Sequence, residues 1–314
     1  MDYNISVIIP TMNRPSSLAR TLGYIAESSY LPTEIIIVDQ SSTPEARDAT
    51  RCVTIEYGTI LNINYVYQEI SSLTKARNCG LRMAKEEIIV FSDDDVDVRK
   101  STFSEVHRLM QDPTIALVGG FNEGDKMKKV SLLSCLFLKA SYRKRHTGHV
   151  AAGLYGRFPS STDIEVPTEW AMGFFFVVRK SLIDKWNVRF DENLKYYAYA
   201  EDLDFTYGYY LNAKEENYKC IMSRNLTVRH NVSAEFRTTQ FKVTMMEMIH
   251  REYIAHKYND NFSPLSLLWC NWGTFVLRLI KRNRPLDVIS AMCFVSRNRK
   301  QIHRGNLFYE DYMM

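Results

Sequence analysis

Five short runs rich in isoleucine and valine within the first 120 residues constrain the fold more than any other feature of this sequence. They are Ile5–Ile9, Ile35–Val38, Ile63–Tyr67, Ile88–Phe91 and Ile115–Val118. Each run has the length of a β-strand. Their mostly continuous apolar character is typical of strands buried on both faces of a largely parallel sheet. Helical spacing at 15–28, 71–85 and 101–110 separates several of the runs. The alternation predicts an α/β sandwich with right-handed crossovers.

The residues from 121 to 232 are less regular. We expect a loop-rich insertion over 121–170 that contains one helix near the apolar stretch Leu132–Leu138. Ala171–Val178 resembles another buried strand, and a helix should follow it through Trp186. A further helix is predicted over Glu201–Asn212, because its acidic first residues suit the positive end of a helix dipole.

A helical pattern then runs from Phe236 to about residue 300, with breaks near Pro264 and Pro285. We therefore expect an α/β domain over 1–232, with a change of character near residue 120, and a helical extension over 233–314.

Composition places the chain among ordinary globular proteins. Of its 314 residues 46% are hydrophobic, and the net charge of +4 is small for this length. We expect no nucleic-acid partner. Six cysteines occur without any CxxC spacing, which predicts reduced thiols and a cytoplasmic protein, either free or at the inner face of the cell membrane. The first residues have neither a basic region nor a long apolar region, so they do not resemble a signal peptide.

Polar residues follow three of the predicted strands. These strand ends are Pro10-Thr11-Met12-Asn13-Arg14, Asp39-Gln40-Ser41-Ser42 and Asp93-Asp94-Asp95. Functional loops of such sheets gather at the carboxyl ends of the strands. The first loop also offers Asn13 as a cap for the helix that begins at Pro15.

The acidic triplet is the sharpest of these strand ends. Alternating geometry sends Asp93 and Asp95 to one side, where two like charges need a cation to compensate them. Their oxygens suit Mg²⁺ or Mn²⁺, with a diphosphate completing the coordination shell. A solvated acidic turn is the alternative.

Five stretches in order resemble the family 2 glycosyltransferases. They are Val7-Ile8-Ile9-Pro10-Thr11-Met12-Asn13-Arg14, Ile36-Ile37-Val38-Asp39, Ala76-Arg77-Asn78-Cys79-Gly80, Asp93-Asp94-Asp95 and Glu201-Asp202. The resemblance covers about residues 4 to 232 and leaves the last eighty or so outside. It implies a GT-A fold and transfer of a sugar from a nucleotide-sugar with inversion. It also implies that 1–232 is the catalytic domain, in which 1–120 would bind the nucleotide-sugar donor and 121–232 the acceptor.

The resemblance also implies which residues bind the donor. Asp39 would accept a hydrogen bond from the base, and Arg77 would face phosphate unless it forms an ion pair with Asp93. Asp95 would bind the metal, and Asp93 either the metal or the ribose. The remaining donor-binding candidates are Pro10, Thr11, Asn13, Arg14 and Asp94.

On the acceptor side, the Glu201-Asp202 pair matches the family's E-D pair, in which the aspartate is the general base. The alternative for this pair is simple capping of a helix. Trp170 and Gly173 are further acceptor-binding candidates, because an indole can stack on a sugar; a core tryptophan is the alternative.

Two features around the metal remain. His230 follows a predicted strand, where some GT-A enzymes place a histidine ligand; a structural histidine is the alternative. Many family members also have another acid directly after the second aspartate, whereas this chain has Val96, with Asp97 beyond it.

The C-terminal region combines an apolar helix with basic residues. Leu265–Ile280 contains two tryptophans and precedes Lys281-Arg282-Asn283-Arg284, but it is too short and interrupted for a membrane span. We expect residues 265–284 either to lie on an anionic membrane, or to pack on the catalytic domain or on a second subunit.

Together these features predict a metal-dependent inverting glycosyltransferase. UDP-sugars are favoured as donors, and a glycan or lipid-linked glycan hydroxyl as acceptor, in bacterial surface polysaccharide or glycoconjugate assembly. A sugar-nucleotide nucleotidyltransferase is disfavoured because the first loop has no glycine. A non-catalytic scaffold with a transferase fold is the other alternative.

Overall fold

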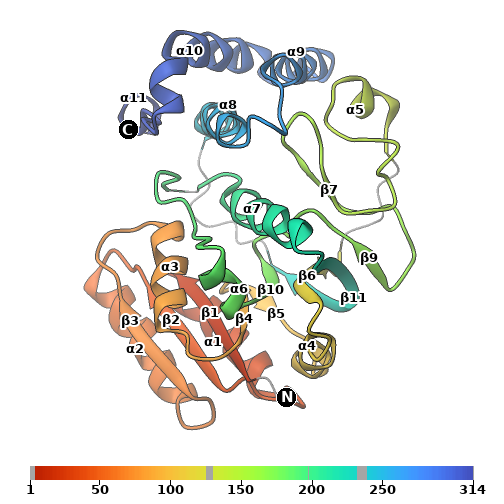
Figure 1. Cartoon of the computed structure of the whole chain (residues 1–314). Coiled ribbons are helices and arrows are strands. Elements are labelled where there is room, and N and C mark those ends of the chain that lie inside the picture. The colour runs from red at the N-terminus through yellow and green to blue at the C-terminus, as the bar shows by residue number, and fades with distance from the viewer. Residues whose placement is uncertain (1–3, 125–129, 197, 232–238, 314) are drawn as a thin grey trace. The chain divides into compact units, whose positions relative to one another are not determined.

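The computed structural model describes residues 4–124, 130–196, 198–231 and 239–313 (Figure 1). Contacts between residues divide the chain into two compact units. The first comprises Met1–Lys126, Thr162–Tyr197 and Glu201–Ser233, and the second Met127–Ser161, Ala198–Ala200 and Ala234–Met314. The stretch Met127–Ser161, which we assigned from the sequence to the acceptor half, thus groups with the C-terminal helices.

A single mixed sheet forms the centre of the first unit. Over the described residues its strands are β1 (Ile5–Thr11), β2 (Glu34–Asp39), β3 (Ile63–Tyr67), β4 (Ile88–Ser92), β5 (Val96–Asp97), β6 (Ile115–Asn122), β9 (Glu165–Pro167), β10 (Phe175–Arg179) and β11 (Lys219–His230). They follow the order β3-β2-β1-β4-β10-β6-β11-β5, and β9 pairs with β11. All five strands predicted from the isoleucine and valine runs are present.

The parallel part of the sheet brings the functional strand ends together. β1 pairs in parallel with β2, Thr11 opposite Asp39, and with β4, Ile8 opposite Phe91. β10 then runs antiparallel between β4 and β6. The carboxyl ends of β1, β2 and β4 therefore share one edge of the sheet, as the sequence predicted.

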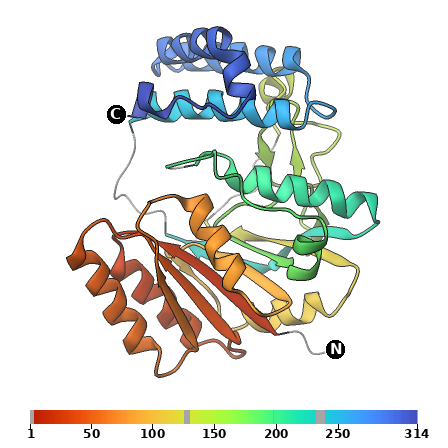
Figure 2. The same cartoon turned by 60° about the vertical axis from the view of Figure 1, so that its left-hand side comes forward.

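Helices cover both faces of this sheet (Figures 1 and 2). They are α1 (Pro15–Ala26), α2 (Pro44–Tyr57), α3 (Leu73–Met83), α4 (Thr102–Met110), α6 (Lys180–Lys185) and α7 (Glu201–Glu215). Residues of α3, α6 and α7 form one buried cluster with Ile8, Ile36 and Phe91 of the strands. Burial on both faces explains why the strand sequences are apolar at successive positions.

The start of α1 differs from our expectation. Asn13 does not cap this helix: the cap position is Arg14, which makes no capping hydrogen bond through its side chain. Asn13 instead adopts φ 57° and its side chain bonds Ser42, with Nδ2 2.9 Å from the Ser42 hydroxyl and Oδ1 2.9 Å from the Ser42 amide. Asn13 thus joins the loops after β1 and β2.

The second unit is mainly helical. It contains α5 (Leu132–Leu136), β7 (His149–Val150), β8 (Gly156–Arg157), α8 (Gln240–Lys257), α9 (Pro264–Ile280), α10 (Pro285–His303) and α11 (Tyr309–Met313). The predicted C-terminal helices are confirmed, and α9 and α10 begin at the two prolines that marked the expected breaks.

Buried Arg251 of α8 ties this second unit together. Its Nε lies 2.8 Å from the Gly153 carbonyl oxygen and its Nη1 lies 2.9 Å from Oδ1 of Asn271 in α9. Among the described residues, no helix is both long and apolar enough to cross a membrane. All six cysteines are free thiols.

Candidate active site

The acidic triplet lies in the loop between β4 and β5. Its first residue is fixed by a backbone hydrogen bond, in which the Asp93 amide donates to the Phe174 carbonyl oxygen at 3.0 Å. Asp94 points into the protein, where it accepts from the Thr11 hydroxyl at 2.6 Å and pairs with Arg14 Nη2 at 2.7 Å. Burial raises the pKa of Asp94 to about 7. Asp94 and Thr11 therefore bind each other, and their contact with a donor stays a prediction.

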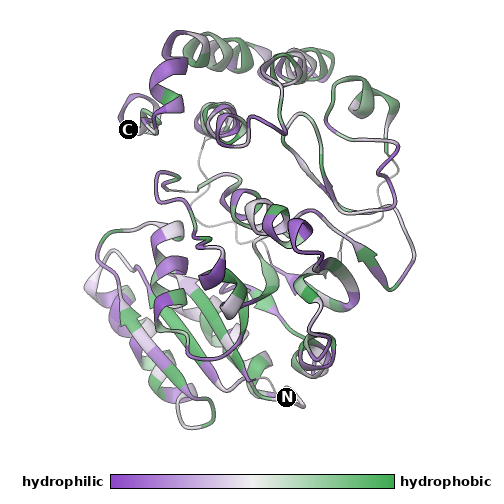
Figure 3. Cartoon of the chain, viewed as in Figure 1, coloured by the Kyte–Doolittle hydropathy of each residue, from purple (hydrophilic) through white to green (hydrophobic). Residues whose placement is uncertain are grey.

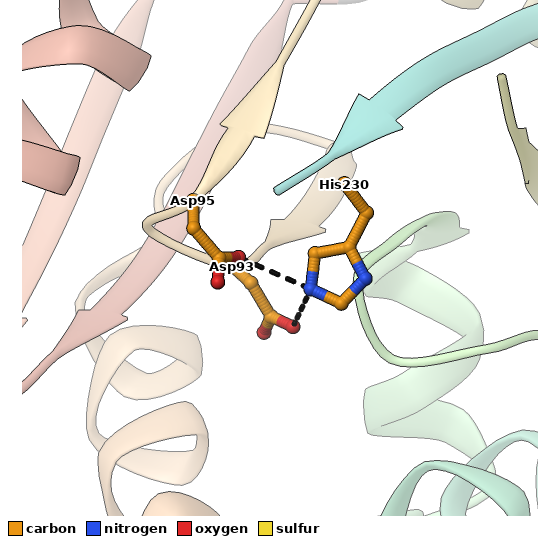
Figure 4. Close-up of side chains that lie close together, drawn as sticks. All are labelled: Asp93, Asp95 and His230. Carbon is orange, nitrogen blue, oxygen red and sulfur yellow. Dashed lines mark ion pairs between the residues drawn. The ribbon is translucent and has the colours of Figure 1, made fainter. Parts of the chain in front are cut away.

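His230 completes a cluster with the other two carboxylates (Figure 4). Its Nε2 lies 3.1 Å from Asp95 Oδ1 and 3.9 Å from Asp93 Oδ2. The ring stacks on Phe174 with centroids 5.3 Å apart. His230 ends β11, where it pairs with Val96 of β5, so an antiparallel pairing delivers the imidazole to the acidic loop.

The cluster fits a divalent cation. One ligand atom from each of Asp93, Asp95 and His230 can lie within 4.8 Å of the others. Two carboxylates and one imidazole suit Mn²⁺, and the oxygens also suit Mg²⁺. Burial disfavours the charged form of His230, but the hydrogen bond to Asp95 and the charges of Asp93 and Asp95 outweigh it, so the pKa of His230 is raised. A cation would have to displace that proton.

Two basic side chains hold neighbouring acids in place. Arg14 is partly exposed, and its Nη1 lies 3.3 Å from Asp95 Oδ2. Arg20 of α1 pairs with Asp97, the acid that follows Val96 in the chain. Arg14 thus stands at the rim of the cluster, and Asp97 is engaged outside it.

Arg77 of α3 connects the acidic loop after β4 to α7. Its side chain is only 2% exposed, and Nη1 lies 2.5 Å from Glu201 Oε1. Nη2 lies 3.0 Å from both Asp93 Oδ1 and the Gly173 carbonyl oxygen. The structure favours the ion-pair alternative for Arg77, because the guanidinium is directed at these three groups in the interior.

Gly173, which binds Arg77 through its carbonyl oxygen, also binds Asp202 through its amide. The Gly173 amide donates to Asp202 Oδ2 at 2.7 Å, and the Leu203 amide donates to Oδ1 at 2.7 Å. A Cβ on Gly173 would lie 3.1 Å from both Arg77 Nη2 and Asp202 Cβ, so any side chain there would force these groups to shift by a few tenths of an ångström. Burial raises the pKa values of both Asp202 and Glu201, although backbone amides and Arg77 act in the opposite direction.

Asp39 is fully buried at the end of β2. Its Oδ1 accepts from the Ser41 amide at 2.8 Å and from the Ser41 hydroxyl at 2.6 Å, and Oδ2 accepts from the Tyr65 hydroxyl at 2.9 Å. The carboxylate can accept a further hydrogen bond, but Asp39 has no exposed surface, so its contact with a nucleobase stays a prediction. Sequence reasoning missed Tyr65. Burial, together with its bond to Asp39, raises the pKa of this phenol.

Two predicted contacts are buried. Trp170 is only 3% exposed, so its indole offers no open face to a sugar, and the structure favours the core alternative. Pro10 is likewise buried in β1. The fold and the site together define an α/β protein with an acidic sheet edge whose side chains fit a cation, the arrangement expected of a GT-A transferase.

Comparison with known sequences identifies the family. The sequence profile described as Glycosyl transferase family 2 matches residues 6–164, which is just over half of the chain. The chain belongs to glycosyl transferase family 2.

Two relatives illustrate how the similarity is distributed. Poly(ribitol-phosphate) beta-N-acetylglucosaminyltransferase TarP of Staphylococcus aureus is 24% identical over 295 residues, which cover 91% of this chain and 82% of that protein. Validoxylamine A glucosyltransferase of Streptomyces hygroscopicus is 38% identical over 96 residues, or 29% of this chain and 20% of that protein. The chain thus spans about a fifth of the length of the second relative.

Solved structures show the fold. The mannosyltransferase PcManGT of Pyrobaculum calidifontis, solved with GDP-Man and Mn²⁺, has a TM-score of 0.58 at 17% identity, over 95% of this chain and 76% of that one. S. aureus TarS 1–349 in complex with UDP has a TM-score of 0.53 at 20% identity, over 98% of this chain and 89% of that one. These likenesses confirm the predicted GT-A fold.

Proposed function

We propose that this glycosyltransferase is metal-dependent and moves a sugar from a nucleotide-diphosphate sugar to an acceptor hydroxyl with inversion. The observation that carries the proposal is the cluster of Asp93, Asp95 and His230 at the carboxyl end of the central strand. A divalent cation held there supplies charge stabilisation to the leaving diphosphate. Arg14, at the rim of the cluster, adds a positive charge beside the same position.

Asp202 is the proposed general base. Two backbone amides at 2.7 Å fix its carboxylate, one from its own helix and one from Gly173. This geometry orients the oxygens before the acceptor arrives, as base catalysis requires. Burial raises the pKa of Asp202, which makes the carboxylate a stronger base than an exposed aspartate.

Arg77 has a positioning role in this proposal. It contacts Asp93, Glu201 and the Gly173 carbonyl, and Gly173 in turn contacts Asp202. One buried cation thereby fixes the distance between a metal ligand and the base. A direct displacement needs both groups held on opposite sides of the sugar.

The donor is proposed to be a UDP-sugar, with UDP-GlcNAc the first to test. TarP is named for transfer of N-acetylglucosamine, and TarS has been solved with UDP and with UDP-GlcNAc. We place the enzyme in the cytoplasm, consistent with six free thiols, and its acceptor among the glycans or lipid-linked glycans of bacterial surface polysaccharides.

A thermal-shift screen tests this proposal. UDP, dTDP and GDP are added with and without Mn²⁺, since a ligand that binds only the folded state raises the melting temperature. We expect one nucleotide to stabilise the protein, and only with metal. Its cognate sugar donors are then supplied with candidate acceptors, and NMR of the anomeric proton should show inverted configuration. A folded protein that binds no nucleotide and hydrolyses no donor would instead be the scaffold alternative.

A further inference from the structure

The charge of the protein is divided unequally between its two units. Nineteen of the 40 lysine and arginine residues fall in the second unit, but only seven of the 36 acidic residues do. The formal net charge is therefore +12 for the second unit and −8 for the first. Met127–Ser161 alone contains seven basic residues and no acidic one. The modest total of +4 conceals a strongly basic module.

Within the second unit, α9 is apolar on its exposed side as well as its buried side. Leu267, Cys270 and Thr274 face the interior. The opposite side carries exposed Leu265, Leu268, Trp269, Trp272 and Leu279, which recur at helical spacing. Arg278 is the only charged residue of the helix. A surface helix ordinarily has a polar outer side, and a helix that is apolar all round is normally covered.

The short helix α5 extends this apolar side. Its Leu132, Leu133 and Leu136 are exposed. Trp269 Nε1 donates to the Leu136 carbonyl oxygen at 2.7 Å, and the Trp269 ring lies 5.8 Å from that of Phe137. Phe137 in turn packs where a side chain on Gly273 of α9 would lie. α5 and α9 are therefore joined at Trp269, and Figure 3 shows the hydrophobic colour on both.

We infer that this α5–α9 surface (Leu132, Leu133, Leu136, Leu265, Leu268, Trp269, Trp272 and Leu279) docks the protein on an anionic lipid surface. The side chains of these eight residues are between 45% and 83% exposed. Each helix leads into a basic cluster: Arg143-Lys144-Arg145 follows α5, and Lys281-Arg282-Asn283-Arg284 follows α9 directly. Apolar residues with tryptophans beside basic ones are typical of a monotopic contact that inserts partway into the headgroup region.

The charge of the second unit favours an anionic membrane over two other possible partners of this surface, a second copy of the chain and a soluble anionic polymer. A second copy of the chain that associates through the same surface would bring two units of +12 together, and like charges oppose that association. A soluble anionic polymer would satisfy the basic residues but would leave the leucines and tryptophans in water. An anionic membrane satisfies both, because its headgroups pair with the cations while its acyl region covers the apolar side chains.

Vesicle co-sedimentation of the full chain tests this inference. We expect binding to vesicles of phosphatidylcholine with phosphatidylglycerol, little binding to phosphatidylcholine alone, and weaker binding as salt rises. Leu265→Gln with Leu268→Gln should lower the partition coefficient by about tenfold or more, because both leucines lose their burial in lipid. Lys281→Glu with Arg282→Glu should lower it too and reduce its dependence on salt.

The matched control replaces two apolar residues exposed elsewhere, Ile55→Gln with Ile60→Gln, whose side chains in the first unit are 64% and 60% exposed. This control variant should bind vesicles as the unaltered protein does.

The inference is overturned if the folded full chain fails to bind anionic vesicles at low salt, or if the Leu265→Gln and Leu268→Gln variant binds them as well as the unaltered protein does. It is also overturned if the leucine substitutions change only the self-association of the protein. The same holds if the protein binds soluble polyphosphate as tightly as it binds anionic vesicles. Nucleotide binding in solution, measured in parallel, tests the proposed function separately.

Discussion

Replacing Asp202 by asparagine separates its proposed chemistry from its structural role. Both carboxylate oxygens accept backbone hydrogen bonds at 2.7 Å, from Gly173 and from Leu203. Asparagine retains one acceptor oxygen but turns an NH₂ group toward the other amide. A simple helix cap would tolerate asparagine, whereas this arrangement across two elements does not tolerate it fully.

The size of each effect follows from these contacts. Loss of one hydrogen bond to a charged group lowers the free energy of unfolding by about 1.5–3 kcal/mol. Loss of the general base lowers kcat by about 10²–10⁴-fold. Nucleotide affinity should change far less, because the base interacts with the acceptor proton mainly in the transition state.

The assay is steady-state transfer with the donor found by the nucleotide screen, together with calorimetric nucleotide binding and a thermal melt. Glu201→Gln is the matched control: it removes the neighbouring buried charge, retains an acceptor for Arg77 and leaves Asp202 in place. We expect Glu201→Gln to retain much more activity than Asp202→Asn. Near-normal kcat in a folded Asp202→Asn protein would refute the assignment of the base.

Three further predictions concern the same connection. Gly173→Ala should lower the free energy of unfolding by about 1–3 kcal/mol in urea denaturation, because its Cβ would lie 3.1 Å from Arg77 Nη2 and Asp202 Cβ. Arg77→Lys should lower it by about 1.5–3 kcal/mol in the same assay, since one ammonium keeps the charge but cannot replace a fork that reaches Asp93, Glu201 and Gly173; an unchanged midpoint would contradict the bridging role. The pKa of Asp202 is raised, and the base works only when ionised, so kcat/KM should fall as pH falls through that raised pKa. A pH profile whose acid limb lies at the ordinary aspartate pKa of about 4 would argue against this.

The sequence predicted the sheet well because buried parallel strands have a strong local signal. The helix α2 was missed for the opposite reason. Only Thr50 and Thr54 of α2 are buried, so it has no apolar stripe at helical spacing, and the cap at Thr43 followed by Pro44 was the remaining signal. β10 begins at Phe175, later than expected, because the backbone of Gly173 bonds Arg77 and Asp202 instead of a neighbouring strand.

The candidate site was predictable in its strand ends but not in its internal contacts. Asp93 and Asp95 lie close to one another as expected, but in the turn between β4 and β5, so strand alternation is not the reason. The sequence could not reveal that Asp39 and Asp94 turn inward, because their donors Tyr65 and Thr11 come from other strands. The approach of His230 depends likewise on the pairing of β11 with β5, which joins segments far apart in the chain.

Metal dependence of nucleotide binding is the most direct test of the proposed function. Calorimetry of UDP is carried out with Mn²⁺ and with EDTA, on the unaltered protein, on Asp95→Asn and His230→Ala, and on the exposed control Asp48→Asn. We predict binding only with Mn²⁺, weakened by about tenfold or more in the two site variants and unchanged in the control. If UDP bound equally well with Mn²⁺ and with EDTA, the cluster of Asp93, Asp95 and His230 would not be a metal site for the donor.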